Sequence, residues 1–340
     1  MSKIFYFHIG LHKTATTFLQ QNVFPECHRL FYIKRNELRK LNKDGPFKGW
    51  RISRDFEMGF ARSPEFWLDY GDQLIQTAIP KQVLSKNQNV LISSEGIAGA
   101  RIFLRNTDPM IDPFSPVNDP HLLIFHFRNL RKIIAKYGFD RIKIILTIRR
   151  QDYWFASNYS EYSHLIPRSS QKDFETQIEH MISPEFRYYW EGMWANYKLL
   201  RDCLLEITGK EDYLILPHEL LVENSHEFIK RLSNFIEDDG ILKSSFDVLN
   251  KNSVGNNEWK KKKRRYYFKP YRLFDKYDNR VISFSIGKER IIKLKPYISD
   301  QVMAFFQKTN QQLDQDENLD LVKYGYYQNI QPIVDNKIRN

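Results

Sequence analysis

The stretch HIGLHKTATTFLQ, residues 8–20, follows a short apolar run near the amino terminus and is typical of a turn that opens into a helix. Such a turn leaves backbone N–H groups unpaired and directed at one point, and the helix dipole adds partial positive charge there. Lys13 adds a full charge, and Thr14, Thr16 and Thr17 add hydroxyl donors. The stretch therefore predicts an anion-binding loop. The simpler interpretation is a capped helix beside a solvated lysine.

The composition agrees with an anionic ligand but does not identify it. The chain has 340 residues, 42% of them hydrophobic, and a formal net charge of +11. That charge favours phosphates, sulfates, acidic glycans, nucleic acid or anionic lipid. Its two cysteines, Cys27 and Cys203, lie far apart, which supports neither a disulfide framework nor a cysteine-based zinc site. With no apolar run of membrane-spanning length and no room for a secretory signal, we expect a soluble, cytoplasmic protein.

Short β-branched or aromatic runs alternate along the chain with longer segments whose apolar residues recur at spacings of three and four. This alternation predicts an α/β fold, with a central parallel sheet flanked by helices. The expected strands are residues 3–9, 89–93, 142–148 and 213–216, with 30–33 as a candidate fifth. The expected helical segments are residues 78–87, 121–138 and 189–210.

No repeat and no low-complexity linker divides the chain. We therefore expect one domain over residues 1–340, with a helical carboxyl-terminal extension at about 285–340. Gly138 and Gly209 close two of the helical segments, as glycines at helix carboxyl ends do. Ligands of open parallel sheets bind beyond the carboxyl ends of the strands, so the residues that follow each strand are the candidates for chemistry.

The segment GLHKTATTFLQ resembles the 5′-phosphosulfate-binding loop of sulfotransferases that use 3′-phosphoadenosine-5′-phosphosulfate (PAPS), usually written around K[TS]GTT. Ala15 stands where that family usually has glycine. A Walker A loop needs GxxxxGK[ST], whereas Gly10 lies only three residues before Lys13, so the loop is shorter. The resemblance implies a P-loop-like sulfotransferase fold. It also implies that the 5′ end of the donor binds Gly10, His12, Lys13, Thr14, Ala15, Thr16 and Thr17.

A second signature of the same family follows the third expected strand. Arg149 ends that strand and Ser157 comes eight residues later. The resemblance implies that this pair holds the 3′-phosphate of the donor, a task that suits a permanently charged guanidinium and a serine hydroxyl. The alternative is that Arg149 forms an interdomain salt bridge and that Ser157 is an ordinary serine of a helix.

A later basic segment, residues 249–268, resembles the family loop that folds over the 3′-phosphate. The resemblance implies that Lys251 and Ser253 take part there. The basic run Lys260 to Arg265 is open to several interpretations: contact with an anionic acceptor, contact with a membrane surface, a solvated charge run, or a nucleic-acid patch.

The resemblance implies transfer of a sulfuryl group from PAPS to an acceptor hydroxyl, with a glycan or glycolipid as the preferred acceptor and PAP, adenosine 3′,5′-bisphosphate, as the other product. Lys13 would stabilise the charge that builds on the leaving bisphosphate. Glu95, directly after the strand at 89–93, is the candidate base for the acceptor proton, and His12 is its rival. The alternative is that Glu95 caps the following turn or pairs with a basic residue of a loop. No metal is required by this scheme.

Two other classes of function remain open at this stage. A P-loop nucleotide or small-molecule kinase would also use Lys13, although the short loop argues against it. A non-enzymatic nucleic-acid-binding module is favoured by the charge, but it leaves Lys13, Glu95 and Arg149 at strand ends unexplained. We therefore expect no nucleic-acid partner.

Overall fold

The structure is a computed structural model. The residues that it describes are 3–33, 56, 59–86, 88–97, 119–166, 168–183, 193–243, 257–261, 264–268, 282–286 and 290–328.

A five-stranded sheet forms the centre of the protein, and every pair of neighbouring strands in it is parallel. The strands are β1 (Lys3–His8), β2 (Leu30–Ile33), β3 (Asn89–Ser93), β4 (Phe139–Ile148) and β5 (Tyr213–Pro217). Their order across the sheet is β2-β3-β1-β4-β5, so β1 lies between β3 and β4. The predicted α/β fold is confirmed, including its candidate fifth strand, and β4 begins three residues earlier than expected.

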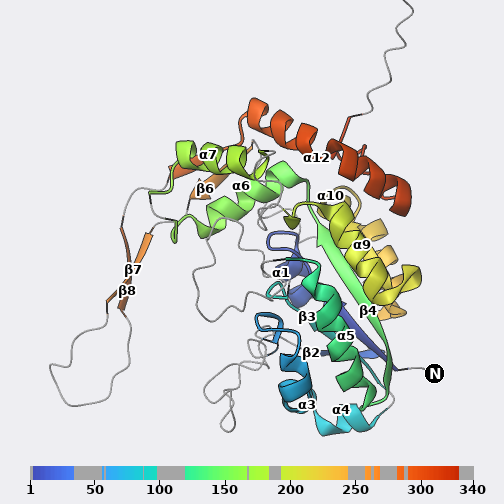
Figure 1. The fold of residues 1–340 in the computed structure, drawn as a ribbon. Coiled ribbons are helices and arrows are strands. Elements are labelled where there is room, and N and C mark those ends of the chain that lie inside the picture. Colours follow the sequence, from blue (N-terminus) through green and yellow to red (C-terminus); the bar gives the residue numbers. More distant parts are fainter. Residues whose placement is uncertain are drawn as a thin grey trace, which may run out of the picture.

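Each face of the sheet carries its own hydrophobic core because side chains along a strand alternate between the two faces. On β1, Phe5 and Phe7 belong to the larger core, beneath α3 (Phe66–Ala78), α5 (Leu122–Ala135) and α9 (Tyr197–Thr208), which lie side by side. Ile4 and Tyr6 belong to the second core, on the opposite face, which α10 (His218–Glu223) and α11 (Ser225–Ile236) cover. Helices lie on both sides of the sheet (Figure 1), most strand residues are buried, and this explains why the strand sequences are largely apolar.

The α-helices of the described residues are α1 (Thr16–Phe18), α3 (Phe66–Ala78), α4 (Lys81–Ser85), α5 (Leu122–Ala135), α6 (Gln151–Tyr162), α7 (Gln171–Met181), α9 (Tyr197–Thr208), α10 (His218–Glu223), α11 (Ser225–Ile236) and α12 (Pro296–Glu317). The expected segment 121–138 contains α5 over most of its length, whereas 78–87 and 189–210 contain the shorter helices α4 and α9. Gly209 is the C-cap of α9 at φ 85°, and Gly138 follows α5 at φ 78°, in keeping with their expected place. Among the described residues, no helix combines the length and the apolar character needed to cross a bilayer.

Two small antiparallel pairs lie outside the main sheet. They are β6 (Glu258–Lys261) with β9 (Arg290–Lys293), and β7 (Arg264–Phe268) with β8 (Ile282–Ile286). The carboxyl-terminal extension is therefore helical only from Pro296, not from about 285, because residues 290–293 pair with β6. Within the basic run, the Lys261 ammonium donates to the Ser169 carbonyl at 2.6 Å, which gives this lysine a structural contact.

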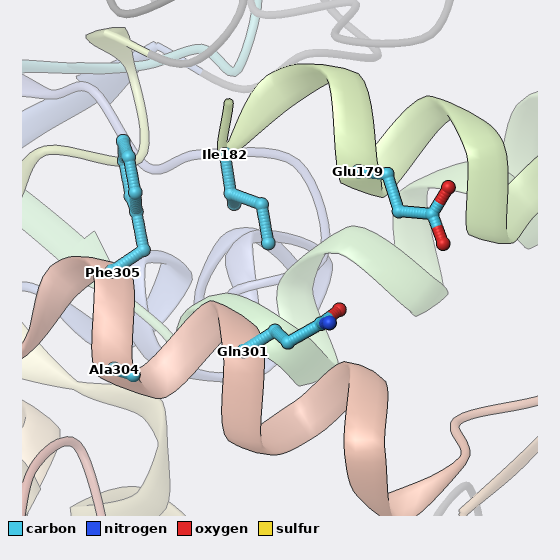
Figure 2. A pocket seen from close by; sticks show the side chains of 5 residues that line it. All are labelled: Glu179, Ile182, Gln301, Ala304 and Phe305. Atoms are coloured by element: carbon cyan, nitrogen blue, oxygen red, sulfur yellow. The ribbon is translucent and has the colours of Figure 1, made fainter. Parts of the chain in front are cut away.

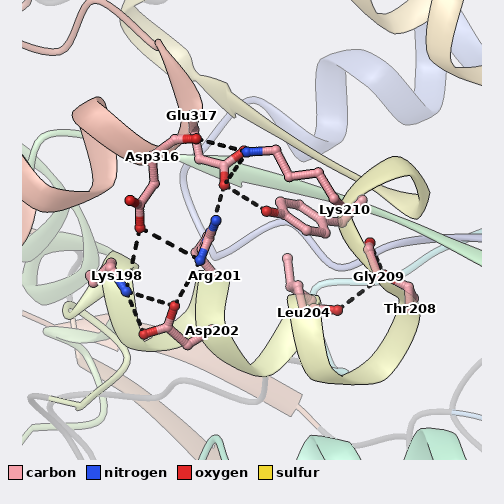
Figure 3. A network of polar contacts seen from close by, with 10 residues as sticks. Lys198, Arg201, Asp202, Leu204, Thr208, Gly209, Lys210, Asp316 and Glu317 are labelled. Atoms are coloured by element: carbon pink, nitrogen blue, oxygen red, sulfur yellow. Dashed lines mark hydrogen bonds and ion pairs between the residues drawn. The ribbon is translucent and has the colours of Figure 1, made fainter.

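A network of charges fastens the end of α12 to α9 and the start of β5 (Figure 3). The Arg201 guanidinium donates to the Glu317 carboxylate at 2.5 Å, and the Tyr213 hydroxyl donates to the same oxygen at 2.6 Å. Both side chains of the Arg201–Glu317 pair are only 11% exposed. Since a buried charge without its partner is costly, this contact couples α12 to the sheet.

We expect Glu317→Ala to lower the free energy of unfolding by about 2 kcal/mol or more, because it removes the shared acceptor and leaves the Arg201 charge less well paired. Urea denaturation measures the change. Glu223→Ala is the control, since the Glu223–Lys323 pair is 48% exposed on both sides and should contribute less than about 0.5 kcal/mol. Equal effects of the two substitutions would contradict the structural role of Glu317.

Candidate active site

The loop that follows β1 turns on Gly10. A Cβ at this position would lie 2.6 Å from the hydroxyl oxygens of Thr16 and Thr147, and 2.7 Å from Nε2 of His8. Such distances are far below van der Waals contact, so only glycine lets the backbone of the loop pass this close to these side chains. Within the loop, Lys13 (φ 68°) and Ala15 (φ 69°) both adopt the left-handed conformation.

Carbonyl groups of the loop are anchored by the body of the protein. The carbonyl of His12 accepts a hydrogen bond from the Trp154 indole at 2.8 Å. The carbonyl of Lys13 accepts one from the Arg149 guanidinium at 3.2 Å. These two carbonyl oxygens therefore bind groups of the surrounding protein, and the backbone N–H groups of the loop stay available to a ligand.

The amides of the loop are the available donors. Within the described part of the chain, the backbone N–H groups of Lys13, Ala15, Thr16 and Thr17 donate no hydrogen bond. The Thr16 hydroxyl is buried and also lacks a partner there. Buried polar groups are rarely left unpaired, so the Thr16 hydroxyl indicates a place where a ligand could supply an acceptor, and the unpaired amides lie in the same loop. The loop predicted to bind an anion thus carries a cluster of unpaired donors within the described part of the chain.

The three threonines of the loop differ in their placement. The Thr14 hydroxyl is buried, donates to the Leu11 carbonyl at 2.6 Å and lies 2.7 Å from the Thr147 hydroxyl. It therefore stabilises the loop from within, whereas the hydroxyls of Thr16 and Thr17 have no partner among the described residues. Thr17 is exposed.

The Lys13 ammonium is paired with a residue that the sequence did not single out. Its Nζ lies 2.5 Å from a carboxylate oxygen of Glu161, on the last turn of α6. The two side chains are 39% and 29% exposed. The only sequence signal for Glu161 is its position four residues after Ser157, which places both on the same side of a helix.

Arg149 and Ser157 lie beside the loop, as their positions after β4 predicted. Besides contacting the Lys13 carbonyl, Arg149 has a buried Nε without a hydrogen-bond partner among the described residues. Burial lowers the pKa of the Arg149 guanidinium, although Glu219 opposes the shift. Ser157 is buried on α6, and its neighbours on that helix face, Trp154 and Glu161, contact the loop. An anion here would meet a guanidinium and a hydroxyl from two elements.

The adjacent Arg150 contacts Asp152 and Tyr153 and not the loop. Its guanidinium donates two hydrogen bonds to the Asp152 carboxylate, both at 2.8 Å, and lies over the ring of Tyr153 at 4.0 Å. The start of α6 is fixed further by the buried side chains of Gln151 and Asn310, which exchange two hydrogen bonds. Helix α12 thereby holds α6, and with it Ser157, in place.

The two rival bases predicted from the sequence form a pair. Nδ1 of His12 lies 2.8 Å from a carboxylate oxygen of Glu95, and both side chains are about one-fifth exposed. A histidine whose Nδ1 donates to a carboxylate keeps Nε2 as its proton acceptor and is held in one orientation. The arrangement can take a proton from a hydroxyl that approaches the loop.

Two residues predicted from the sequence to hold the 3′-phosphate, Lys251 and Ser253, lie outside the described residues.

A pocket of about 420 Å³ lies between α7 and α12, lined by Glu179, Ile182, Gln301, Ala304 and Phe305 (Figure 2). None of the site residues predicted from the sequence lines it, so it is separate from the loop.

Comparison with known proteins gives structural likenesses only. No family model and no curated protein sequence matches the chain. The fold is similar to a sulfotransferase from Alicyclobacillus acidocaldarius (11% identity, 96% of this chain and 100% of that one, TM-score 0.48). It is also similar to the sulfotransferase domain of the Synechococcus PCC 7002 olefin synthase (13% identity, 94% and 96%, TM-score 0.37). A third likeness is to retinol dehydratase, solved with androsterone and inactive cofactor PAP (12% identity, 69% and 60%, TM-score 0.25). At these scores the likenesses do not assign a function to this chain.

We expect Ala15→Gly to raise the free energy of unfolding by up to about 1 kcal/mol. An alanine in the left-handed conformation costs about 1 to 2 kcal/mol, and the greater freedom of glycine in the unfolded chain offsets part of the gain. Urea denaturation checks this, with Ala156→Gly in α6 as the control that should lose about 1 kcal/mol or more. A destabilised Ala15→Gly variant would show that the loop does not hold this conformation.

Proposed function

We propose that this protein is a sulfotransferase that moves a sulfuryl group from PAPS to an acceptor hydroxyl. The observation that carries the proposal is the group of donors at the loop that have no partner among the described residues: four backbone amides and the buried Thr16 hydroxyl, beside the buried Nε of Arg149. Such a concentration of donors supports a ligand that supplies acceptors. The glycan or glycolipid nature of the acceptor and a cytoplasmic location rest on the sequence alone and stay predictions.

The residues fit the two anionic ends of this donor. The loop amides, Thr16 and Lys13 would hold the 5′-phosphosulfate. Arg149 and Ser157 would hold the 3′-phosphate, and the contact between Arg149 and the Lys13 carbonyl joins the two subsites. Both lie where β1 and β4 end, and those strands are neighbours. A ligand with two anionic groups at one end of a parallel sheet matches this placement.

The chemistry follows from the charges at the loop. The donor supplies an activated sulfuryl group, and negative charge builds on the departing bisphosphate. Lys13 and the loop amides stabilise that charge more in the transition state than in the ground state, which lowers the barrier. His12, oriented by Glu95, takes the proton of the acceptor hydroxyl as its oxygen attacks sulfur.

We expect Lys13→Ala to lower kcat by about a hundredfold or more, while the affinity for PAP falls much less, since the charge on Lys13 acts mainly as the leaving group departs. Transfer of labelled sulfate measures turnover, and calorimetry measures affinity. Lys230→Ala, which removes an exposed lysine from α11, is the control and should leave both unchanged. Undiminished turnover in Lys13→Ala removes the main support of the proposal, and magnesium-dependent turnover of ATP would favour a kinase instead.

Arg149→Ala should weaken PAP binding by about ten- to a hundredfold, the loss expected for charge-assisted hydrogen bonds to a phosphate. Adenosine 5′-monophosphate, which lacks the 3′-phosphate, should lose less affinity than PAP, because it is affected only through the contact of Arg149 with the Lys13 carbonyl. Arg128→Ala is the matched control, because this exposed arginine of α5 makes a distant pair with Glu206 at 3.9 Å. If PAP binds Arg149→Ala as tightly as wild type, Arg149 has no part in the 3′ subsite.

A further inference from the structure

Glu161 places a negative charge beside a loop whose unpaired groups are all hydrogen-bond donors. Its carboxylate lies 2.5 Å from the ammonium of Lys13. A carboxylate in this position repels any anion that enters the loop. It also forms an ion pair with the Lys13 ammonium, the charge that the proposed reaction needs.

The place of Glu161 is fixed by the helix that carries it. Trp154, Ser157 and Glu161 follow one another at spacings of three and four along α6, so they share one helix face. The Trp154 indole donates to the His12 carbonyl, which packs this face against the loop. The pairing of Glu161 with Lys13 therefore follows from the way the helix is seated.

The Lys13 backbone has an unfavourable conformation. Its φ of 68° lies in the left-handed region, which is unfavourable for a residue with a side chain. The preceding residue, His12, pairs with Glu95 at the end of β3, whereas Lys13 pairs with Glu161 on α6. The turn thus sends two successive side chains to two different carboxylates.

We propose that Glu161 is the positioning residue for Lys13. In the donor-free protein it holds the ammonium at the mouth of the loop, and the 5′ anion of the donor takes its place. The exchange is feasible because half-exposed ion pairs contribute little net stability, whereas the donor meets several charged and amide groups at once. This inference rests on the proposed function, because it concerns the 5′ subsite of that reaction.

The inference is tested by calorimetry of PAP binding to the full chain and to Glu161→Gln. The variant should bind PAP about fivefold more tightly, the factor set by an exposed ion pair that no longer has to be broken. A merely structural contact would have the opposite effect, since its loss weakens binding. Glu227→Gln, which removes a carboxylate from a similarly exposed pair with Arg231 on α11, should not change the affinity.

Two mononucleotides show where Glu161 acts. Adenosine 5′-monophosphate should gain affinity for Glu161→Gln as PAP does, whereas adenosine 3′-monophosphate should not. In a Lys13→Met background the gain for PAP should shrink, because no ammonium remains to be released. Glu161→Ala should change PAP affinity in the same direction as Glu161→Gln and serves as the second variant.

The outcomes separate this inference from the proposed function. If wild type binds PAP and Glu161→Gln binds it equally or less tightly, the positioning role is overturned and the sulfotransferase proposal stands. A gain for adenosine 3′-monophosphate equal to that for PAP also overturns the role, because the effect would then be one of general charge. If neither protein binds PAP, both proposals fail.

Discussion

The candidate site depends on the missing side chain of Gly10. In that space the hydroxyl oxygens of Thr16 and Thr147 and Nε2 of His8 come within 2.7 Å of where a Cβ would lie. The floor of the loop is uncharged, since burial lowers the pKa of His8 to about 3 and its Nδ1 lies 2.7 Å from the Ser93 hydroxyl. Because His8 beneath the loop is neutral, Lys13 and Arg149 supply the positive charge of the site.

The strand order explains why residues far apart in the sequence meet here. Since β1 lies between β3 and β4, the segments that follow these three strands emerge at one edge of the sheet. They carry His12 and Lys13, Glu95, and Arg149 respectively. Helix α6 then returns from β4 and covers the loop with Trp154 and Glu161, while α12 holds the start of α6.

Much of this could be predicted from the sequence, because strands buried on both faces are continuous apolar runs and the loop motif follows the first of them. The side-chain pairings could not. The inward hydroxyl of Thr14, the His12–Glu95 pair and the partner of Lys13 depend on which elements become neighbours in space. The conformation of Ala15 was partly predictable. The family motif that the loop resembles has glycine at this position, and Ala15 adopts the left-handed conformation that favours glycine.

The charge balance of the loop follows from its backbone. His12 and Lys13 are adjacent, yet they pair with Glu95 and Glu161, which lie on different elements. Lys13 has the left-handed φ of 68°, and the side chains of these two successive residues reach separate partners. One pair can then stay intact while an anion competes for the other. The same turn that exposes the loop amides therefore separates the proton acceptor of the proposed reaction from the cation that faces the leaving group.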